Sequence, residues 1–140
     1  MAVHVLAVLA YQEGDRATSA YLACSVNTNP VIIRRLLLSL QKARLVDTTK
    51  GAGAGSRLSR SPQRINMAEI YRSVEAVESF SSPSRKPKAD CPVGSCILEA
   101  LAGIFDSAQK AMEQDLAKTT LADVIHAVKS SGACSGTKAI

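Results

Sequence analysis

Two cysteines are spaced in a way that could support thiol chemistry in this chain of 140 residues. Cys91 and Cys96 flank a PVGS segment, and a turn there would bring their sulfur atoms within reach of a disulfide bond. Ser95 is a residue type that caps helices, and a helix beginning there would make the Cys96 thiol more reactive. The pair is therefore a candidate redox switch. The alternative is plain packing, because cysteine also behaves as a small hydrophobic residue, and we expect that role for Cys24.

Metal and cofactor chemistry is not expected. An iron–sulfur cluster normally takes four protein ligands, most of them thiolates. Beyond Cys91 and Cys96, the remaining candidates are the remote Cys134 and His126, so we expect no iron–sulfur cluster and no other metal or cofactor. His4 and His126 lie in apolar helical stretches, where a lone histidine is seldom a ligand. No Ser/His/Asp or paired-carboxylate pattern indicates a catalytic site, so the sequence does not predict an enzyme.

Composition and charge restrict the classes of fold and partner. Aromatic residues make up 4% of the chain and tryptophan is absent, so an aliphatic core built from helices is favoured. A formal net charge of +5 indicates an anionic partner, nucleic acid first and a membrane surface second, with solubility as the simple alternative. No apolar run reaches about 18 residues, and no basic segment like that of a signal peptide precedes the first apolar stretch. We expect no membrane partner and a cytoplasmic protein with reduced thiols.

The first third of the chain predicts a helix-turn-helix. An apolar helix over residues 2–13 should end at Gly14. A polar residue at 18 or 19 can cap a short second helix, and Thr28 or Asn29 can cap a longer third one with Pro30 at its first position. A short helix, a tight turn and a longer helix are typical of this DNA-binding motif. The third helix should turn Leu36, Leu37 and Leu40 toward the core and leave outward Thr28, Asn29, Val31, Arg34 and Arg35.

A β-wing is predicted directly after this motif. Two short strand-like pieces, at 45–46 and 57–58, lie on either side of a glycine-rich tip. A tip with little side-chain bulk can enter a narrow minor groove while neighbouring cations meet phosphates. The glycines do not match a nucleotide-binding loop. The residues of this segment expected to meet DNA are Lys50, Gly51, Gly53, Gly55, Arg57 and Arg60.

The C-terminal half predicts a linker and a dimerisation helix. Asn66 should cap a helix, and a polar, proline-bearing linker follows; its RKPK segment is expected to be solvated, with phosphate binding as the alternative. The helix expected over 95–118 carries one broad apolar stripe that could pair with a second copy. The residues of this apolar stripe are Ile97, Leu101, Ile104, Phe105, Ala108, Met112 and Leu116.

The expected organisation has four parts. Thr119 or Thr120 should cap a last helix. We expect a DNA-binding domain over 1–78, a linker over 79–94, dimerisation helices over 95–130 and a disordered tail over 131–140.

In this order, the segments SVNTNPVIIRRLLLSLQKARLV, GAGAGSRLSRSPQRINMAEIYRSVE and CPVGSCILEAL, followed by LADVI, resemble the Rrf-type winged helix-turn-helix regulators. The resemblance runs from the first residue to about Val128. It implies a mainly α fold with a small β-wing, and a homodimer crossed by the helix at 95–118. That dimer would bind palindromic double-stranded DNA, with each recognition helix in a major groove and each wing, Gly51 to Arg60, in an adjacent minor groove. The base-reading residues it implies are Thr28, Asn29, Pro30, Val31, Ile32, Arg34 and Arg35.

The chain also departs from that family's pattern. Cluster-binding members have Tyr and Glu where this chain places Ile32 and Arg34, and they carry three closely spaced cysteines where this chain has two. Family members usually begin with several more residues, some of them basic, so a truncated start is expected. The leading interpretation is a dimeric, sequence-specific DNA-binding repressor, with a thiol response as an added hypothesis. The alternative is a dimeric protein-interaction module that has kept the fold but lost operator binding.

Overall fold

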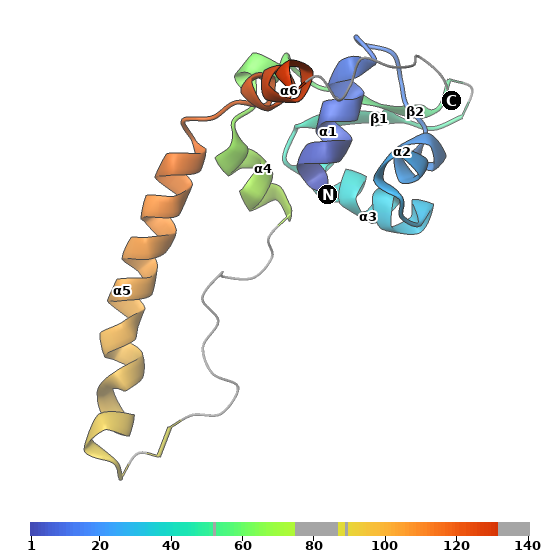
Figure 1. Ribbon diagram of the computed structural model, residues 1–140. Coiled ribbons are helices and arrows are strands. Elements are labelled where there is room, and N and C mark those ends of the chain that lie inside the picture. The colour runs from blue at the N-terminus through green and yellow to red at the C-terminus, as the bar shows by residue number, and fades with distance from the viewer. Residues whose placement is uncertain (52, 75–86, 89, 132–140) are drawn as a thin grey trace.

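The computed structural model describes residues 1–51, 53–74, 87–88 and 90–131. Most elements form a head around α1, and one long helix extends away from it (Figure 1). In chain order the elements are α1 (Ala2–Tyr11), α2 (Ser19–Val26), α3 (Pro30–Lys42), β1 (Val46–Thr49), β2 (Gly55–Leu58), the 3-10 helix η1 (Pro62–Arg64), α4 (Met67–Val74), α5 (Pro92–Leu116) and α6 (Leu121–Ser130). The prediction of a mainly α fold with a small wing is confirmed.

Local hydrogen bonds fix the helix-turn-helix. The Thr18 hydroxyl accepts from the backbone N–H of the third residue of α2, 3.2 Å away. Asn27, in the left-handed conformation at φ 56°, ends α2. The Asn29 carboxamide accepts from the Val31 N–H at 2.8 Å, and Pro30 is the first residue of α3. These caps satisfy N–H groups that a helix leaves unpaired at its start, so the turn between α2 and α3 has a defined geometry. The predicted positions of both caps are confirmed.

An aliphatic core lies between α1, α3 and the elements around them. Ile33, Leu37 and Leu40 of α3 are buried in it, whereas Leu36 lies at its margin. Fully burying such a side chain contributes about 1.5–3 kcal/mol relative to leaving it in water. Because α3 places three of these residues in the core, its orientation is fixed and its opposite face is directed outward. Other members of the core are Val5, Leu6, Leu9, Leu22, Leu45, Ile65, Ile70 and Leu121.

The wing is an antiparallel hairpin with a third segment paired to it. β1 and β2 pair from Val46 opposite Leu58 to Thr49 opposite Gly55. Ala17, before α2, exchanges two backbone hydrogen bonds of 2.9 Å with Ser56 of β2. Both strands are therefore longer than the predicted pairs of residues, and β2 is held on its second edge.

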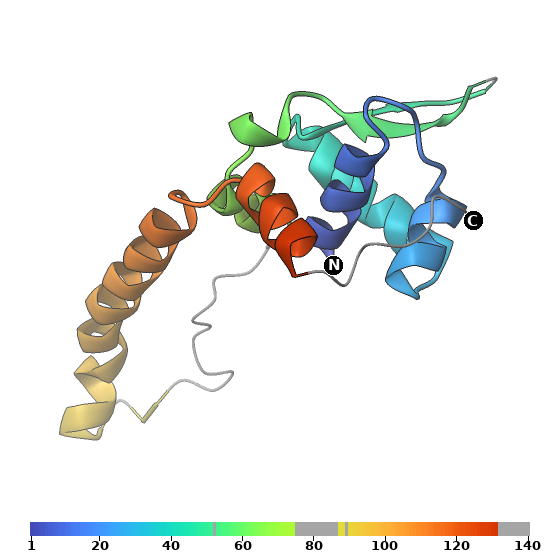
Figure 2. The ribbon, with the colours of Figure 1, turned by 45° about the horizontal axis from the view of Figure 1, so that its top comes forward.

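The long helix α5 leaves the head. It extends away from the other elements (Figures 1 and 2), and none of its 25 residues is buried. It meets the head at α4, where Arg72 Nε lies 2.6 Å from Glu113 Oε2. It begins at Pro92, with Cys91 as its N-cap residue, rather than at Ser95 as predicted. Proline fits the first helical position because that residue's N–H has no partner inside the helix. In the part of the chain that the structure describes, no helix is both long and apolar enough to cross a membrane.

The chain returns from α5 to the head through α6. The Leu121 N–H donates to the Ile65 carbonyl at 2.8 Å, and the Leu121 side chain is fully buried. Thr120 and Asp123 cap α6 reciprocally. The predicted organisation groups α6 with the dimerisation helix, and this division into domains stays a prediction. The Leu121 side chain of α6 lies in the core of the head. The expected linker lies largely, and the expected tail almost wholly, outside the described residues, as do Arg85 and Cys134.

Candidate nucleic-acid interface

The outward face of α3 is a continuous line of side chains. At 3.6 residues per turn, Val31, Arg35, Leu38 and Lys42 share one face of the helix, opposite the three buried side chains. Val31 is 47% exposed and Leu38 is 59% exposed, and both cations are exposed. Ile32, 46% exposed, lies on one flank of this line. The face thus mixes aliphatic and cationic groups, and its first turn is mainly aliphatic.

A cleft separates the other flank of α3 from the wing. Its volume is about 560 Å³. Arg34 lies on the α3 wall, where its Nε donates to the Ser19 hydroxyl at 3.3 Å, and Lys50 lies on the wing wall. Among the described residues that line the cleft, two are cationic and none is acidic. The lining residues are Thr18, Ser19, Arg34, Leu37, Leu38, Gln41, Thr48, Thr49, Lys50, Gly51, Ala54, Gly55 and Ser56.

The tip of the wing stands clear of the rest of the head. Gly51 and Gly53 have φ angles of +88° and +77°, and a Cβ added at either would meet nothing within 4 Å. The Ala54 N–H donates to the Gly51 carbonyl at 2.9 Å, and the Thr49 hydroxyl donates to the Gly53 carbonyl at 3.2 Å. Figure 2 shows the hairpin projecting beyond the helices. The described residues of the tip therefore combine small bulk with a defined backbone, as a segment that enters a narrow groove requires.

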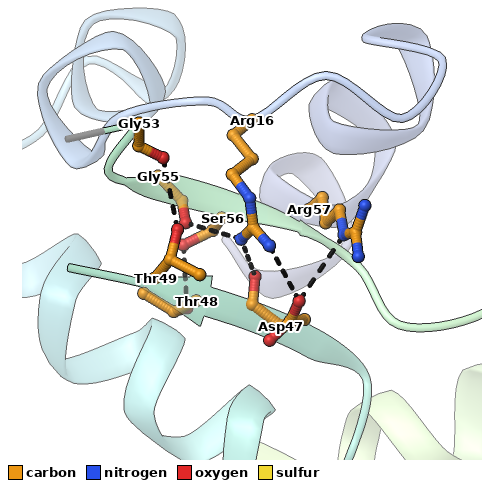
Figure 3. A network of polar contacts seen from close by, with 8 residues as sticks. All are labelled: Arg16, Asp47, Thr48, Thr49, Gly53, Gly55, Ser56 and Arg57. Atoms are coloured by element: carbon orange, nitrogen blue, oxygen red, sulfur yellow. Dashed lines mark hydrogen bonds and ion pairs between the residues drawn. The ribbon is translucent and has the colours of Figure 1, made fainter. Parts of the chain in front are cut away.

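Arg16 ties the segment before α2 to the wing (Figure 3). Its guanidinium donates to the Asp47 carboxylate at 3.0 Å and to the Asp47 carbonyl at 3.3 Å, both on β1, and to the Gly55 carbonyl at 3.2 Å on β2. Arg57, opposite Asp47 in the hairpin, has its Nε 3.5 Å from the same carboxylate. One arginine thus bonds both strands, while Arg57 shares its carboxylate and is half exposed. No pattern in the sequence indicates this role of Arg16.

Gly55 is not part of the tip, contrary to our expectation. It is the first residue of β2, and an added Cβ would lie 2.8 Å from Arg16 Cβ and 3.1 Å from the Ala17 carbonyl oxygen. A glycine is required here because two backbone segments approach closely.

Arg60 lies beyond β2, at the end of the hairpin away from the tip. Its Nη2 is 2.8 Å from Glu69 Oε1. The other Glu69 oxygen accepts from the Asn66 N–H at 3.1 Å, and Asn66 Oδ1 accepts from the Glu69 N–H at 2.9 Å, which caps α4 as predicted. Burial raises the pKa of Glu69, but the hydrogen bonds from Asn66 and Arg60 outweigh it and leave that pKa below its ordinary value. Contact between Arg60 and DNA stays a prediction that competes with this structural ion pair.

The structure does not form the tight turn on which the predicted disulfide depends. PVGS is the first turn of α5 rather than a tight turn, and the Ser95 hydroxyl donates to the Pro92 carbonyl at 2.9 Å instead of capping the helix. Five residues of helix separate two Cα atoms by about 7.5 Å along the axis and about 140° around it. Disulfides need Cα separations of about 4.4–6.8 Å. Cys91 and Cys96 are exposed free thiols, and Cys24, expected to be packed, is also exposed.

The described part of the chain brings together no group of three or more His, Cys, Asp and Glu side chains that could hold a metal ion. His4 is exposed and lies 3.2 Å from the Ser25 hydroxyl, and His126 is exposed on α6. These surroundings do not fit an iron site. The absence of a cofactor stays a prediction.

The comparisons with known proteins match this architecture. The family model described as "Iron-dependent Transcriptional regulator", Rrf2, matches residues 1–127. The chain belongs to the Rrf2 family. YwnA of Bacillus subtilis (strain 168), whose name describes an HTH-type transcriptional regulator, is 37% identical over 126 residues, which are 90% of this chain and 92% of YwnA.

Two solved structures share the fold over most of their length. One, described as a DNA-binding protein, is 37% identical with a TM-score of 0.71 and covers 89% of this chain and 95% of its own. The other, described as a transcriptional regulator from Lactobacillus plantarum, is 28% identical with a TM-score of 0.77 and covers 94% of this chain and 89% of its own. The predicted family is therefore confirmed, and this Rrf2 protein is a transcriptional regulator rather than an enzyme.

Several residues of the interface were missed in the sequence. Leu38 follows Val31 by seven residues, a helical spacing that assigns both to the same face and was a usable signal. Gln41 and Ser19 line the cleft through contacts between elements that no local pattern encodes. Of the predicted residues, Arg34, Lys50, Gly51 and Gly55 line the cleft, whereas Arg57 pairs with Asp47 and Arg60 pairs with Glu69.

Proposed function

We propose that this chain is a dimeric repressor that binds a palindromic DNA operator. The observation that carries the proposal is the cleft between α3 and the wing, whose two walls carry Arg34 and Lys50 and whose lining has no acid among the described residues. A phosphate backbone passing between a major groove and the next minor groove has the charge and the narrow width that such a cleft accommodates. Occupying the cleft directs α3 into the major groove and the glycine tip into the minor groove.

The proposed dimer is supported by the surface of α5. Val93, Ile104 and Phe105 are 66%, 62% and 36% exposed on a helix that buries no residue in the head. A 25-residue helix in water needs a packed apolar face, because helix propensity alone stabilises it little. A second copy offers the same stripe, and a two-fold pair would place two recognition helices on two half-sites. This symmetry is why we propose a palindromic operator.

The test is selection from a random duplex pool followed by anisotropy titrations at several salt concentrations. We expect an enriched palindrome and an affinity that falls steeply with salt. Arg34→Ala and Arg35→Ala should each reduce the slope of log Kd against log salt by about one for every phosphate that the arginine neutralises. Lys118→Ala is the matched control, since Lys118 is exposed beyond the end of α5 and its replacement removes the same charge. Intact dimers that enrich no sequence at low salt would favour the protein-interaction module instead.

An oxidant response is a separate proposal about the same dimer. Both Cys91 and Cys96 are exposed at the start of α5, so small oxidants can reach them. Because the two thiols are separated along the helix, we expect each to react on its own, for example in a disulfide with the other subunit. A disulfide between Cys91 and Cys96 of one chain is less favoured. Quantitative alkylation under mild peroxide tests this. If both cysteines remain reduced while DNA binding is lost, the response has another origin.

A further inference from the structure

We propose that Val31 and Ile32 read thymine in the operator through its C5-methyl group. Both side chains belong to the first turn of α3 and are nearly half exposed, at 47% and 46%. The Asn29 cap and Pro30 at the first position fix the turn that carries them. This inference rests on the proposed function, because it concerns the partner that the same surface would recognise.

The surroundings of the two side chains select DNA bases as their partner. Arg34 and Arg35 follow them within one helical turn, and both are exposed. Recognition helices contact base edges with their N-terminal residues while flanking cations meet phosphates. The aliphatic groups therefore lie at the end of α3 that enters the groove most deeply. An apolar protein partner would have to leave these two charges unpaired or supply carboxylates for them.

The chemistry of the major groove then determines which base is read. Thymine presents a methyl group there beside its O4 acceptor, whereas guanine, cytosine and adenine present hydrogen-bonding groups and no methyl group. Val and Ile side chains cannot form hydrogen bonds. When they pack against a polar base edge, the base loses its hydrogen bonds to water and gains none in return, which costs free energy. Placing them against thymine buries apolar surface on both sides. The first turn of α3 thus favours thymine and disfavours cytosine and guanine at the contacted position.

The experiment uses the full chain and the duplex enriched from the random pool. Each thymine of one half-site is replaced singly by uracil, which removes the methyl group and keeps every hydrogen-bonding group. We expect one or two positions at which uracil weakens binding by about fourfold, the effect of one buried methyl group. Val31→Ala or Ile32→Ala should abolish that difference between the two duplexes. Val128→Ala is the matched control, because it removes exposed methyl groups from α6 instead of α3. This variant should retain the difference in affinity between the thymine and uracil duplexes.

The two proposals fail in different ways. If uracil at every position leaves a specific, salt-dependent affinity unchanged, the thymine contact is wrong and operator binding stands. If both alanine variants keep the full uracil effect, thymine is read by other residues and the assignment to Val31 and Ile32 is wrong. If no sequence is enriched and no duplex binds at low salt, both proposals fail, and the exposed pair then belongs to a protein-binding surface.

Discussion

Arg16 and Asp47, thirty-one residues apart in the chain, join the segment before α2 to the first strand of the wing. Their ion pair of 3.0 Å is partly shielded, with Arg16 23% exposed, and the same guanidinium also reaches β2 through the Gly55 carbonyl. The wing is therefore tied to the segment before α2 at two levels of the hairpin, at Asp47 of β1 and at Gly55, the residue of β2 nearest the tip.

Replacing Arg16 should loosen this attachment. Arg16→Gln is expected to lower the free energy of unfolding by about 1–2 kcal/mol, because the charge-assisted hydrogen bonds to both strands disappear. Urea titration measures the decrease. Lys118→Gln breaks an ion pair whose partners are 74% and 80% exposed, and should cost about 0.5 kcal/mol or less. Equal decreases in the two variants would contradict a special role for Arg16.

Two glycines should respond to alanine in opposite directions. Gly55→Ala places a Cβ 2.8 Å from Arg16 Cβ, and we expect a decrease of about 1–3 kcal/mol in unfolding free energy from the resulting overlap. Gly103→Ala meets open space on α5 and should gain up to about 1 kcal/mol, since alanine favours helix. Thermal melts followed by circular dichroism compare them. A neutral Gly55→Ala would show that the two backbone segments can separate at no cost.

A charge within the apolar stripe of α5 should separate the subunits. Ile104→Glu introduces a carboxylate at a position 62% exposed in one chain, so it would be harmless in a monomer but costly when buried against a second copy. Analytical ultracentrifugation is expected to show monomers. Gln114→Glu adds the same charge on the side of α5 away from the stripe and should leave the dimer intact. Dimers in both variants would mean that another surface pairs the subunits.

Acid should weaken the junction between the hairpin and α4. The pKa of folded Glu69 lies below its ordinary value of 4.5, so its pairing stabilises the fold above that pH and is lost as pH falls through the folded pKa. Hydrogen bonds with Thr120 lower the pKa of Asp123, and hydrogen bonds from Gln109 and Arg72 lower the pKa of Glu113. Protonation of these two groups should therefore also decrease the stability of the fold in acid. The difference in Tm between wild type and Glu69→Gln should shrink below about pH 4.5. A constant difference down to about pH 3 would contradict this.

The head should depend on a residue that follows α5 in the chain. Leu121→Ala empties a fully buried position, and we expect a decrease of about 2–5 kcal/mol in unfolding free energy. Leu98→Ala is the control, because it removes the same side-chain volume from a position on α5 that is 37% exposed in one chain. Both variants are compared at low protein concentration, where the chain is a monomer. A fragment that ends at residue 78 should remain unfolded for the same reason. A folded fragment would show that α6 is dispensable for the core.

What could be predicted from the sequence was encoded locally. Asn29 and Pro30 indicate the start of α3 by themselves, and the spacing of Leu37 and Leu40 determines which face is buried. Pro92 carries the same proline signal, but Ser95 is the more common type of capping residue, so the predicted α5 begins too late.

Contacts between distant residues had no such signal. Arg57 and Arg60 were predicted to contact DNA because they lie near the glycines in the sequence. Their ion pairs with Asp47 and Glu69 form only when the hairpin and α4 are packed. The bonding of both strands by Arg16 and the return of Leu121 to the core are of the same kind. Local patterns located the elements, and tertiary contacts decided which charges are paired within the fold.

The position of Leu121 has a consequence for synthesis on the ribosome. Chains fold from the N-terminus as they emerge, but this head cannot complete its core until residue 121 has been made and has left the exit tunnel. A nascent chain that already displays α3 therefore lacks the support that holds it in its final orientation. For the proposed repressor, this means that polypeptides released early, for example at a premature stop codon within α5, would lack a complete head with which to occupy an operator.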